Sequence, residues 1–199
     1  MAKKIIVLVV LLIGLAGIYS FGGEVPAKPS RTGGMITEDH AKVHVGQLYR
    51  TGAIYLAVAA DSTAYFLVDI ATTGFTANEL HASIAVVVES TAVMKVFADP
   101  VGTSSGTLCS SYNLNRVIAD SPTALFYDTP TLSSNGSIIT PQIIVPAGMN
   151  SICLATFNRD GAEYVFNTGH LYLITVRNTN GQATADIGIY IDYYEQLQP

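Results

Sequence analysis

The stretch ATADIGIYIDYY, residues 183–194, alternates apolar side chains with polar or small ones. One set of alternate positions is apolar throughout: Ala185, Ile187, Ile189, Ile191 and Tyr193. The positions between them form the second set: Asp186, Gly188, Tyr190, Asp192 and Tyr194. Successive side chains of a β-strand point to opposite faces, so this pattern predicts a strand with one buried face.

Similar runs recur along the chain, separated by turn-forming stretches such as SSNGS, PAGMN and NTNG. They occupy residues 54–59, 64–70, 83–88, 92–98, 138–145, 152–157 and 171–176. Beyond residue 34, no interval has the pattern of an amphipathic helix of ordinary length. These features predict an all-β fold, an antiparallel β-sandwich of the jelly-roll type. The Asn180–Gly181 pair is expected to form a hairpin turn into the last strand with positive φ.

Composition sets the size of the fold and bears on its partners. The chain has 199 residues, 49% of them hydrophobic and 13% charged, which suits one packed domain with an appended segment. Its formal net charge of −5 provides no basic surface to neutralise phosphates. Nucleic acid is therefore not an expected partner.

The N-terminus has the pattern of an export signal or a membrane anchor. Lys3 and Lys4 precede an unbroken apolar run over residues 5–18, and small residues follow it. Two interpretations stay open. The segment is either a signal peptide, cleaved after Gly22, or a retained hydrophobic helix whose residues 5–21 contact a membrane.

A short linker separates this segment from the folded part of the chain. Pro26 and Pro29 favour extended backbone, and glycines flank them on both sides. The predicted organisation is a hydrophobic segment at 1–22, a Pro/Gly linker at 23–34 and a β-sandwich domain at 35–199.

No pattern in the sequence points to catalysis, a cofactor or a metal, so we expect a protein that is not an enzyme. The chain has no G-x-S-x-G motif. His40 and His44 are four residues apart, but Ala41 stands where the zinc-protease pattern needs glutamate. Most aspartates fall in turns, where the side chain bonds the backbone, and nothing pairs two carboxylates for glycoside hydrolysis.

Cys109 and Cys153 are the only cysteines in the chain. In an exported domain they could form one disulfide bond. Two separate thiols that each fill space in the core fit the same spacing. Both alternatives stay open at this point.

Several short segments follow one another in an order that resembles a group of tailed-bacteriophage virion proteins. They are ITEDHAKVHVGQLY (36–49), YNLNR (112–116), SPTALFYDTPTLSSNGSII (121–139), PAG (146–148), LYLITVRNTNG (171–181) and IGIYIDYYE (187–195). The resemblance covers most of the chain after the linker. It implies a β-rich head-decoration or other particle-surface protein.

Under this resemblance the protein is a non-enzymatic structural component of a virion. Its expected partners are other copies of itself, with a trimer expected by analogy, and further virion proteins such as the capsid. The hydrophobic N-terminus departs from the pattern, because particle proteins of tailed phages assemble in the cytoplasm. It fits an anchor in a neighbouring particle protein, a virion with a membrane, or a phage-derived domain displayed on the cell envelope.

Asn113, Asn115 and Arg116 are expected to form a structural corner rather than a ligand site. Asparagine side chains close local turns, and an arginine can donate to carbonyl groups or a carboxylate. The alternative function is an envelope-anchored or secreted sandwich that binds carbohydrate or another surface ligand. Exposed Tyr190 and Tyr194 would then be stacking platforms, although they fit a subunit interface equally well.

Overall fold

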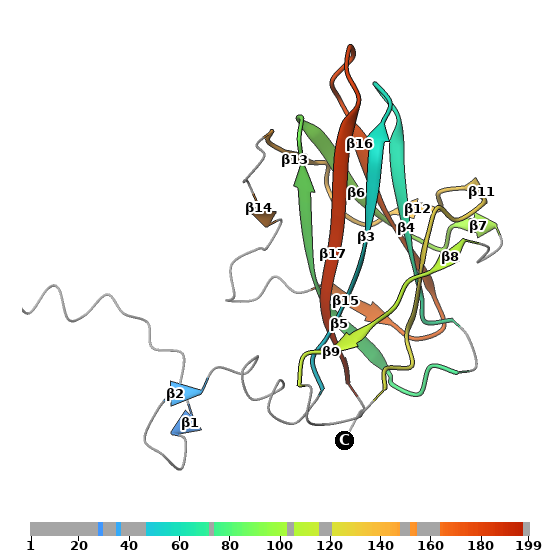
Figure 1. Ribbon diagram of the computed structural model, residues 1–199. Coiled ribbons are helices and arrows are strands. Elements are labelled where there is room, and N and C mark those ends of the chain that lie inside the picture. The colour runs from blue at the N-terminus through green and yellow to red at the C-terminus, as the bar shows by residue number, and fades with distance from the viewer. Residues whose placement is uncertain are drawn as a thin grey trace, which may run out of the picture. The chain divides into compact units, whose positions relative to one another are not determined.

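The computed structural model describes eight segments of the chain (Figure 1). They are residues 28–29, 35–36, 47–71, 74–102, 106–115, 121–147, 152–154 and 164–196, with the backbone alone described for 28–29, 35–36 and 152–154. The predicted hydrophobic helix at 1–22 and most of the predicted linker lie outside them. No helix in the described segments is long and apolar enough to span a membrane.

The chain divides into two compact units, Met1–Ala41 and Lys42–Pro199. In the first unit, the described backbone forms two short antiparallel strands, β1 (Lys28–Pro29) and β2 (Met35–Ile36). This pair joins the predicted linker to the first residues of the predicted domain. The second unit begins at Lys42, and the predicted domain boundary at residue 35 stays a prediction.

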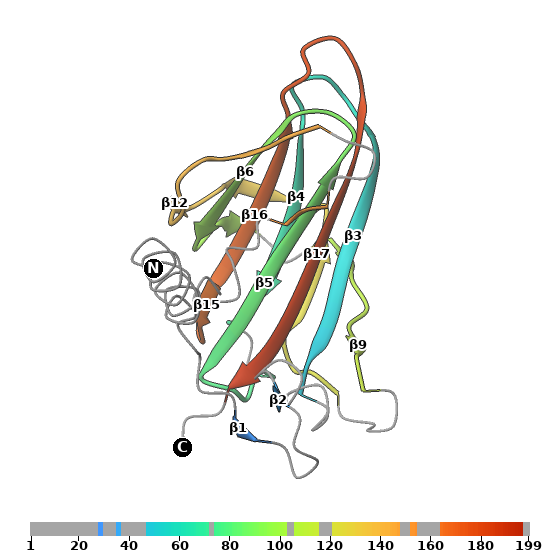
Figure 2. The same ribbon diagram turned by 90° about the vertical axis from the view of Figure 1, so that its left-hand side faces the viewer.

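The second unit contains two large antiparallel sheets, which Figures 1 and 2 show from two sides. The strands of the six-stranded sheet are β3 (Tyr49–Val58), β5 (Glu79–Val88), β9 (Tyr112–Asn113), β14 (Ile152–Leu154), β15 (Tyr164–Asn167) and β17 (Ala185–Gln196). Their order is β14-β5-β17-β3-β9, with β15 also paired to β5.

The seven-stranded sheet lies against it. Its strands are β4 (Thr63–Asp69), β6 (Ala92–Ala98), β8 (Thr107–Leu108), β10 (Leu125–Asp128), β12 (Ser137–Ile138), β13 (Ile143–Val145) and β16 (Leu171–Asn178). Their order is β12-β6-β16-β4-β10-β8, with β13 also paired to β6. A separate two-stranded ribbon joins β7 (Val101–Gly102) to β11 (Leu132–Ser134).

The core lies between the two large sheets, as the alternation in residues 183–194 predicts. Ile187, Ile189, Ile191 and Tyr193 of β17 are all 0% exposed. The Tyr193 ring meets Phe126 of the opposite sheet, with ring centroids 4.8 Å apart. The prediction of an all-β, antiparallel, sandwich-like fold is confirmed, and the described residues contain no helix.

Every predicted run contains a strand, but two local predictions are wrong. The run at 138–145 is split into β12 and β13, because Pro141 lies between them and cannot donate a ladder hydrogen bond. The connection after β16 is not a hairpin, since β16 and β17 belong to different sheets. Neither Asn180 nor Gly181 is among the residues with positive φ.

One connection crosses the outward face of the seven-stranded sheet. The crossing segment, residues 129–136, leads from β10 to β12. The strands β4, β16 and β6 lie between these two in the sheet. At its start, the Thr129 N–H donates to the Tyr65 carbonyl at 3.2 Å. Leu67 and Leu173 pair with each other on this outward face, and both are 0% exposed.

Candidate functional site

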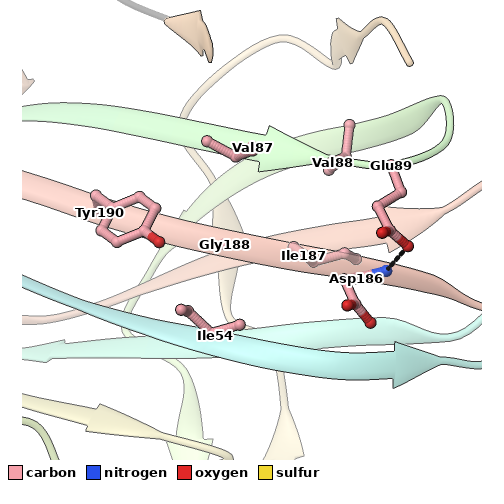
Figure 3. A pocket seen from close by; sticks show the side chains of 8 residues that line it. All are labelled: Ile54, Val87, Val88, Glu89, Asp186, Ile187, Gly188 and Tyr190. Carbon is pink, nitrogen blue, oxygen red and sulfur yellow. Dashed lines mark hydrogen bonds between the residues drawn. The ribbon is translucent and has the colours of Figure 1, made fainter. Parts of the chain in front are cut away.

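A groove of about 220 Å³ lies on the outward face of the six-stranded sheet (Figure 3). It crosses the three neighbouring strands β3, β17 and β5. Its lining residues are Ile54, Val87, Val88, Glu89, Asp186, Ile187, Gly188 and Tyr190. The strand register sets Gly188 between Ile54 and Val87, so these two apolar side chains flank a position that has no side chain.

Two glycines make room for the Tyr190 ring at one end of the groove. A Cβ atom at Gly188 would lie 2.9 Å from Tyr190 Cε2, and one at Gly52 would lie 2.9 Å from Tyr190 Cδ1. Both distances are too short for a real contact. Glycine inside a strand often marks a close approach, and an aromatic ring laid across it covers the bare backbone. Tyr190 therefore lies along the sheet surface.

Two carboxylates form the other end of the groove. Glu89 Oε2 accepts a hydrogen bond from the Asp186 N–H at 3.0 Å, which Figure 3 marks with a dashed line. Asp186 Oδ1 accepts one from the Ala57 N–H at 2.7 Å. The second bond exists because the β3–β17 register shifts between Ala185 and Ile187, and Ala57 has a φ of 51° there.

The charge at this end is not neutralised within the groove. Its described lining contains two acidic residues and no lysine or arginine. Asp192, farther along the same face, is instead paired with Arg50 through two hydrogen bonds of 2.6 and 2.7 Å. That ion pair raises the pKa of the Arg50 guanidinium. The face therefore carries one matched pair and one uncompensated acidic end.

The two predicted stacking tyrosines have different surroundings. Tyr190 lines the groove. Tyr194 is only 7% exposed, and its ring stacks on His81 with centroids 4.7 Å apart. The expectation that Tyr194 is exposed is wrong, because its register partner on β5 is His81, whose ring shelters it.

The predicted corner is described in part. Asn113 lies on β9, where its Oδ1 accepts a hydrogen bond from the Asn115 N–H at 2.8 Å. A side chain that bonds the backbone two residues ahead closes a local turn. Leu114 N–H also donates to the Leu48 carbonyl at 2.9 Å, which ties the corner to the start of β3. Arg116 lies outside the described residues.

Cys109 lies in a connection between two strands, and Cys153 lies on a strand of the six-stranded sheet. Cys109 is a free, half-buried thiol between β8 and β9, and burial, followed by the nearby Asp128 carboxylate, raises its pKa. Cys153 belongs to β14, which pairs with β5. Its side chain lies outside the described part of the chain, and the disulfide bond stays a prediction.

The other titratable residues considered from the sequence do not gather around the groove. Among the described residues, no group of three or more His, Cys, Asp or Glu side chains could hold a metal ion. Asp99 and His170 form an exposed pair at 2.9 Å. His40 and His44, the candidate zinc ligands, lie outside the described residues.

Comparison with protein-family models, with curated proteins and with solved structures finds no match to this chain. The site is therefore judged on its own chemistry. The sequence alone points to Tyr190 but not to the walls or the acidic end of the groove. Gly188 was the available signal, because a glycine within an alternating strand indicates that something lies close to the backbone.

Proposed function

We propose that this protein is a non-enzymatic structural component of a viral particle. It would belong to the decoration or surface proteins of the virion, make lateral contacts through its β-sandwich and attach through its N-terminal segment. The observation that carries the proposal is the exposed apolar edge of the six-stranded sheet. The order of segments resembling tailed-phage virion proteins adds to it.

The exposed edge is the outer side of β3. In the described part of the chain, β9 pairs with β3 only at Tyr49 and Arg50, and no other strand covers that side (Figure 2). The open part carries Ile54 and Leu56, which are 63% and 73% exposed. Open edges with apolar side chains are sites of association between chains, so β3 suits contacts with another copy.

The strand pairing supports the finer proposal of a jelly roll. Along the chain, the first and last long strands pair (β3–β17), and then the next ones inward (β4–β16, β5–β15 and β6–β13). Four nested antiparallel pairs of this kind, divided between two sheets, are the jelly-roll arrangement. Viral capsid proteins and lectins both use it, so the fold alone does not choose between particle assembly and ligand binding.

One observation favours the alternative of a carbohydrate-binding surface protein. Tyr190 lies along the open sheet surface beside two carboxylates, and sugars stack on aromatic rings and donate hydroxyl groups to such acceptors. A glycan array with wild-type protein and the Tyr190→Ala variant tests it. Reproducible sugar binding that Tyr190→Ala abolishes would contradict a purely structural role.

The mass of the protein in its native source tests the leading proposal. Intact-protein mass spectrometry is carried out on material purified with and without detergent. We expect a mass that begins at Met1 or Ala2 in a particle fraction, because the N-terminal segment is retained as an anchor. A mass that begins near Gly23, outside particles, would contradict the virion assignment and favour a secreted or envelope module.

A further inference from the structure

We propose that the groove beside Tyr190 receives a basic side chain, lysine or arginine, presented by a partner polypeptide. The identity of that partner as a particle protein rests on the proposed function. The proposal of a basic side chain does not rest on that function, because it follows from the shape of the groove and the charge at its end.

The shape suits one long side chain laid lengthwise. Gly188 has no side chain, so the Tyr190 ring lies against its backbone, and Ile54 and Val87 stand on either side. The groove volume, about 220 Å³, is below the roughly 300–1,000 Å³ of pockets that enclose a whole small-molecule ligand. Lysine and arginine pack their methylene stems on apolar surface of this kind and keep the charged head in a polar environment.

The negative charge at the end of the groove suits the head group of a lysine or arginine side chain. Glu89 and Asp186 each accept a backbone N–H with one carboxylate oxygen, and each carboxylate has further lone pairs to offer. An ammonium or guanidinium group would form charge-assisted hydrogen bonds there. The Arg50–Asp192 pair on the same face shows this chemistry completed within the chain.

The aromatic ring favours a cation over a neutral sugar. The face of a tyrosine ring attracts cations because its π-electrons make it negative. A saccharide would stack on Tyr190 and donate to the carboxylates, but both negative charges would stay unneutralised. Charge complementarity therefore selects a basic group as the occupant.

Methyl NMR on the full-length protein tests the proposal, with Ile54 and Val87 as reporters. Because its N-terminal segment is hydrophobic, the full-length protein is kept in a detergent. An ethylene-glycol ether is used, since a maltoside or choline head group could itself enter the groove. The probes are the methylamides of Nα-acetylarginine and Nα-acetyllysine. The methylamide of Nα-acetylcitrulline is the matched control, since it has nearly the shape of the arginine probe but no charge.

We expect saturable shifts of both reporters with the basic probes and weaker binding at high salt. In the variant Glu89→Gln/Asp186→Asn, affinity should fall about tenfold or more, because both charges are lost while an acceptor oxygen remains for each backbone N–H. Each single variant is also measured in case the double variant does not fold. Asp99→Asn removes one charge, as each single variant does, but from an exposed turn of the other sheet, and it should bind as wild type does.

Three outcomes would overturn the proposal. The citrulline probe could shift the reporters as strongly as the arginine probe, the uncharged variants could bind as tightly as wild type, or methyl glucoside could bind where arginine does not. These outcomes are independent of the proposed function. A native chain cleaved near Gly23 would remove the virion assignment and leave the binding result standing.

Discussion

The two outward faces of the sandwich carry apolar side chains in opposite environments. On the seven-stranded sheet, Leu67 and Leu173 are 0% exposed on the face that the crossing segment traverses. On the six-stranded sheet, Ile54 is 63% exposed beside the groove. At Leu67 and Leu173 the first face is covered by the chain itself, although Ile144 on β13 of that sheet is 67% exposed, and the second face retains exposed apolar surface at the groove. We therefore expect structural and interaction roles on different sides of one fold.

The largest expected effect is the contrast between Leu173→Ala and Ile54→Ala. Leu173→Ala should lower the free energy of unfolding by about 2–5 kcal/mol, because it removes buried methyl groups and leaves a cavity. Ile54→Ala should change it by no more than about 0.5 kcal/mol. Urea unfolding of the full-length protein, followed by circular dichroism, measures both. Equal losses would break the comparison between the faces.

The second contrast compares the stability loss from alanine at Gly136, in the crossing segment, with that at Gly188, in the groove. Gly136, in the crossing segment, has a φ of +83°, and a Cβ atom there would lie 2.2 Å from the Ala98 carbonyl oxygen. Gly136→Ala should therefore lower the free energy of unfolding by about 1–3 kcal/mol. At Gly188 the added Cβ meets the Tyr190 side chain, which can rotate away, so Gly188→Ala should cost less than about 1 kcal/mol.

The same urea experiment measures both glycine variants. A larger loss for Gly188→Ala than for Gly136→Ala would show that the groove is as rigidly packed as the crossing segment. The groove would then be a closed structural feature rather than an open surface.

The third prediction concerns association through β3. We expect the full-length protein to self-associate, and Leu56→Asp should shift it toward smaller species because it places a charge on the open edge. The free energy of unfolding should stay within about 0.5 kcal/mol of wild type. Size-exclusion chromatography with light scattering measures the mass.

Leu108→Asp provides the matched control, since Leu108 is 58% exposed on β8 of the other sheet. We expect it to leave the mass distribution unchanged. A monomeric wild-type protein at micromolar concentration, or equal effects of the two substitutions, would remove β3 as the contact.

The smallest effect at neutral pH concerns the inward side of the same strand. The Tyr55 hydroxyl donates to the Tyr65 carbonyl of the other sheet at 2.6 Å. Burial, followed by the Asp128 carboxylate, raises the Tyr55 pKa well above its ordinary value of about 10. Folding therefore favours the neutral phenol. Its contribution to stability is present below pH about 10 and is lost as the pH rises toward the folded-state value.

Absorbance titration at alkaline pH should show this phenol ionising late, together with unfolding. Tyr55→Phe should remove one late-titrating group and cost about 1 kcal/mol at neutral pH, the usual contribution of one hydrogen bond. A Tyr55 that titrates near its ordinary pKa in the folded protein would show that the inward face of β3 is open to water.

The strands of the core were predictable because their signal is local. In β5 and β17, apolar residues alternate with other residues because successive side chains point to opposite faces of the sheet. The observed burial of side chains in both strands matches this alternation closely. The continuous apolar runs in β4 and β16 indicate strands buried on both faces, and Leu67 and Leu173 are buried in this way.

The candidate site was predictable only at Tyr190. Val87 stands in a continuous run of valines like the apolar runs of β4 and β16, yet it forms a wall of the groove. An apolar run indicates that both faces exclude water. It does not say whether the same chain or another molecule covers them.

Sequence alone determined the all-β class, the buried side of the last strand and the net negative charge, because each depends on neighbouring residues or on composition. Tertiary structure decided which strands pair, where the crossing segment runs and which carboxylates meet at the groove. Asp186 meets the Ala57 N–H across 129 residues of chain through a shift in strand register. Contacts of this range arise from the packing of whole sheets, so no local pattern of residues encodes them.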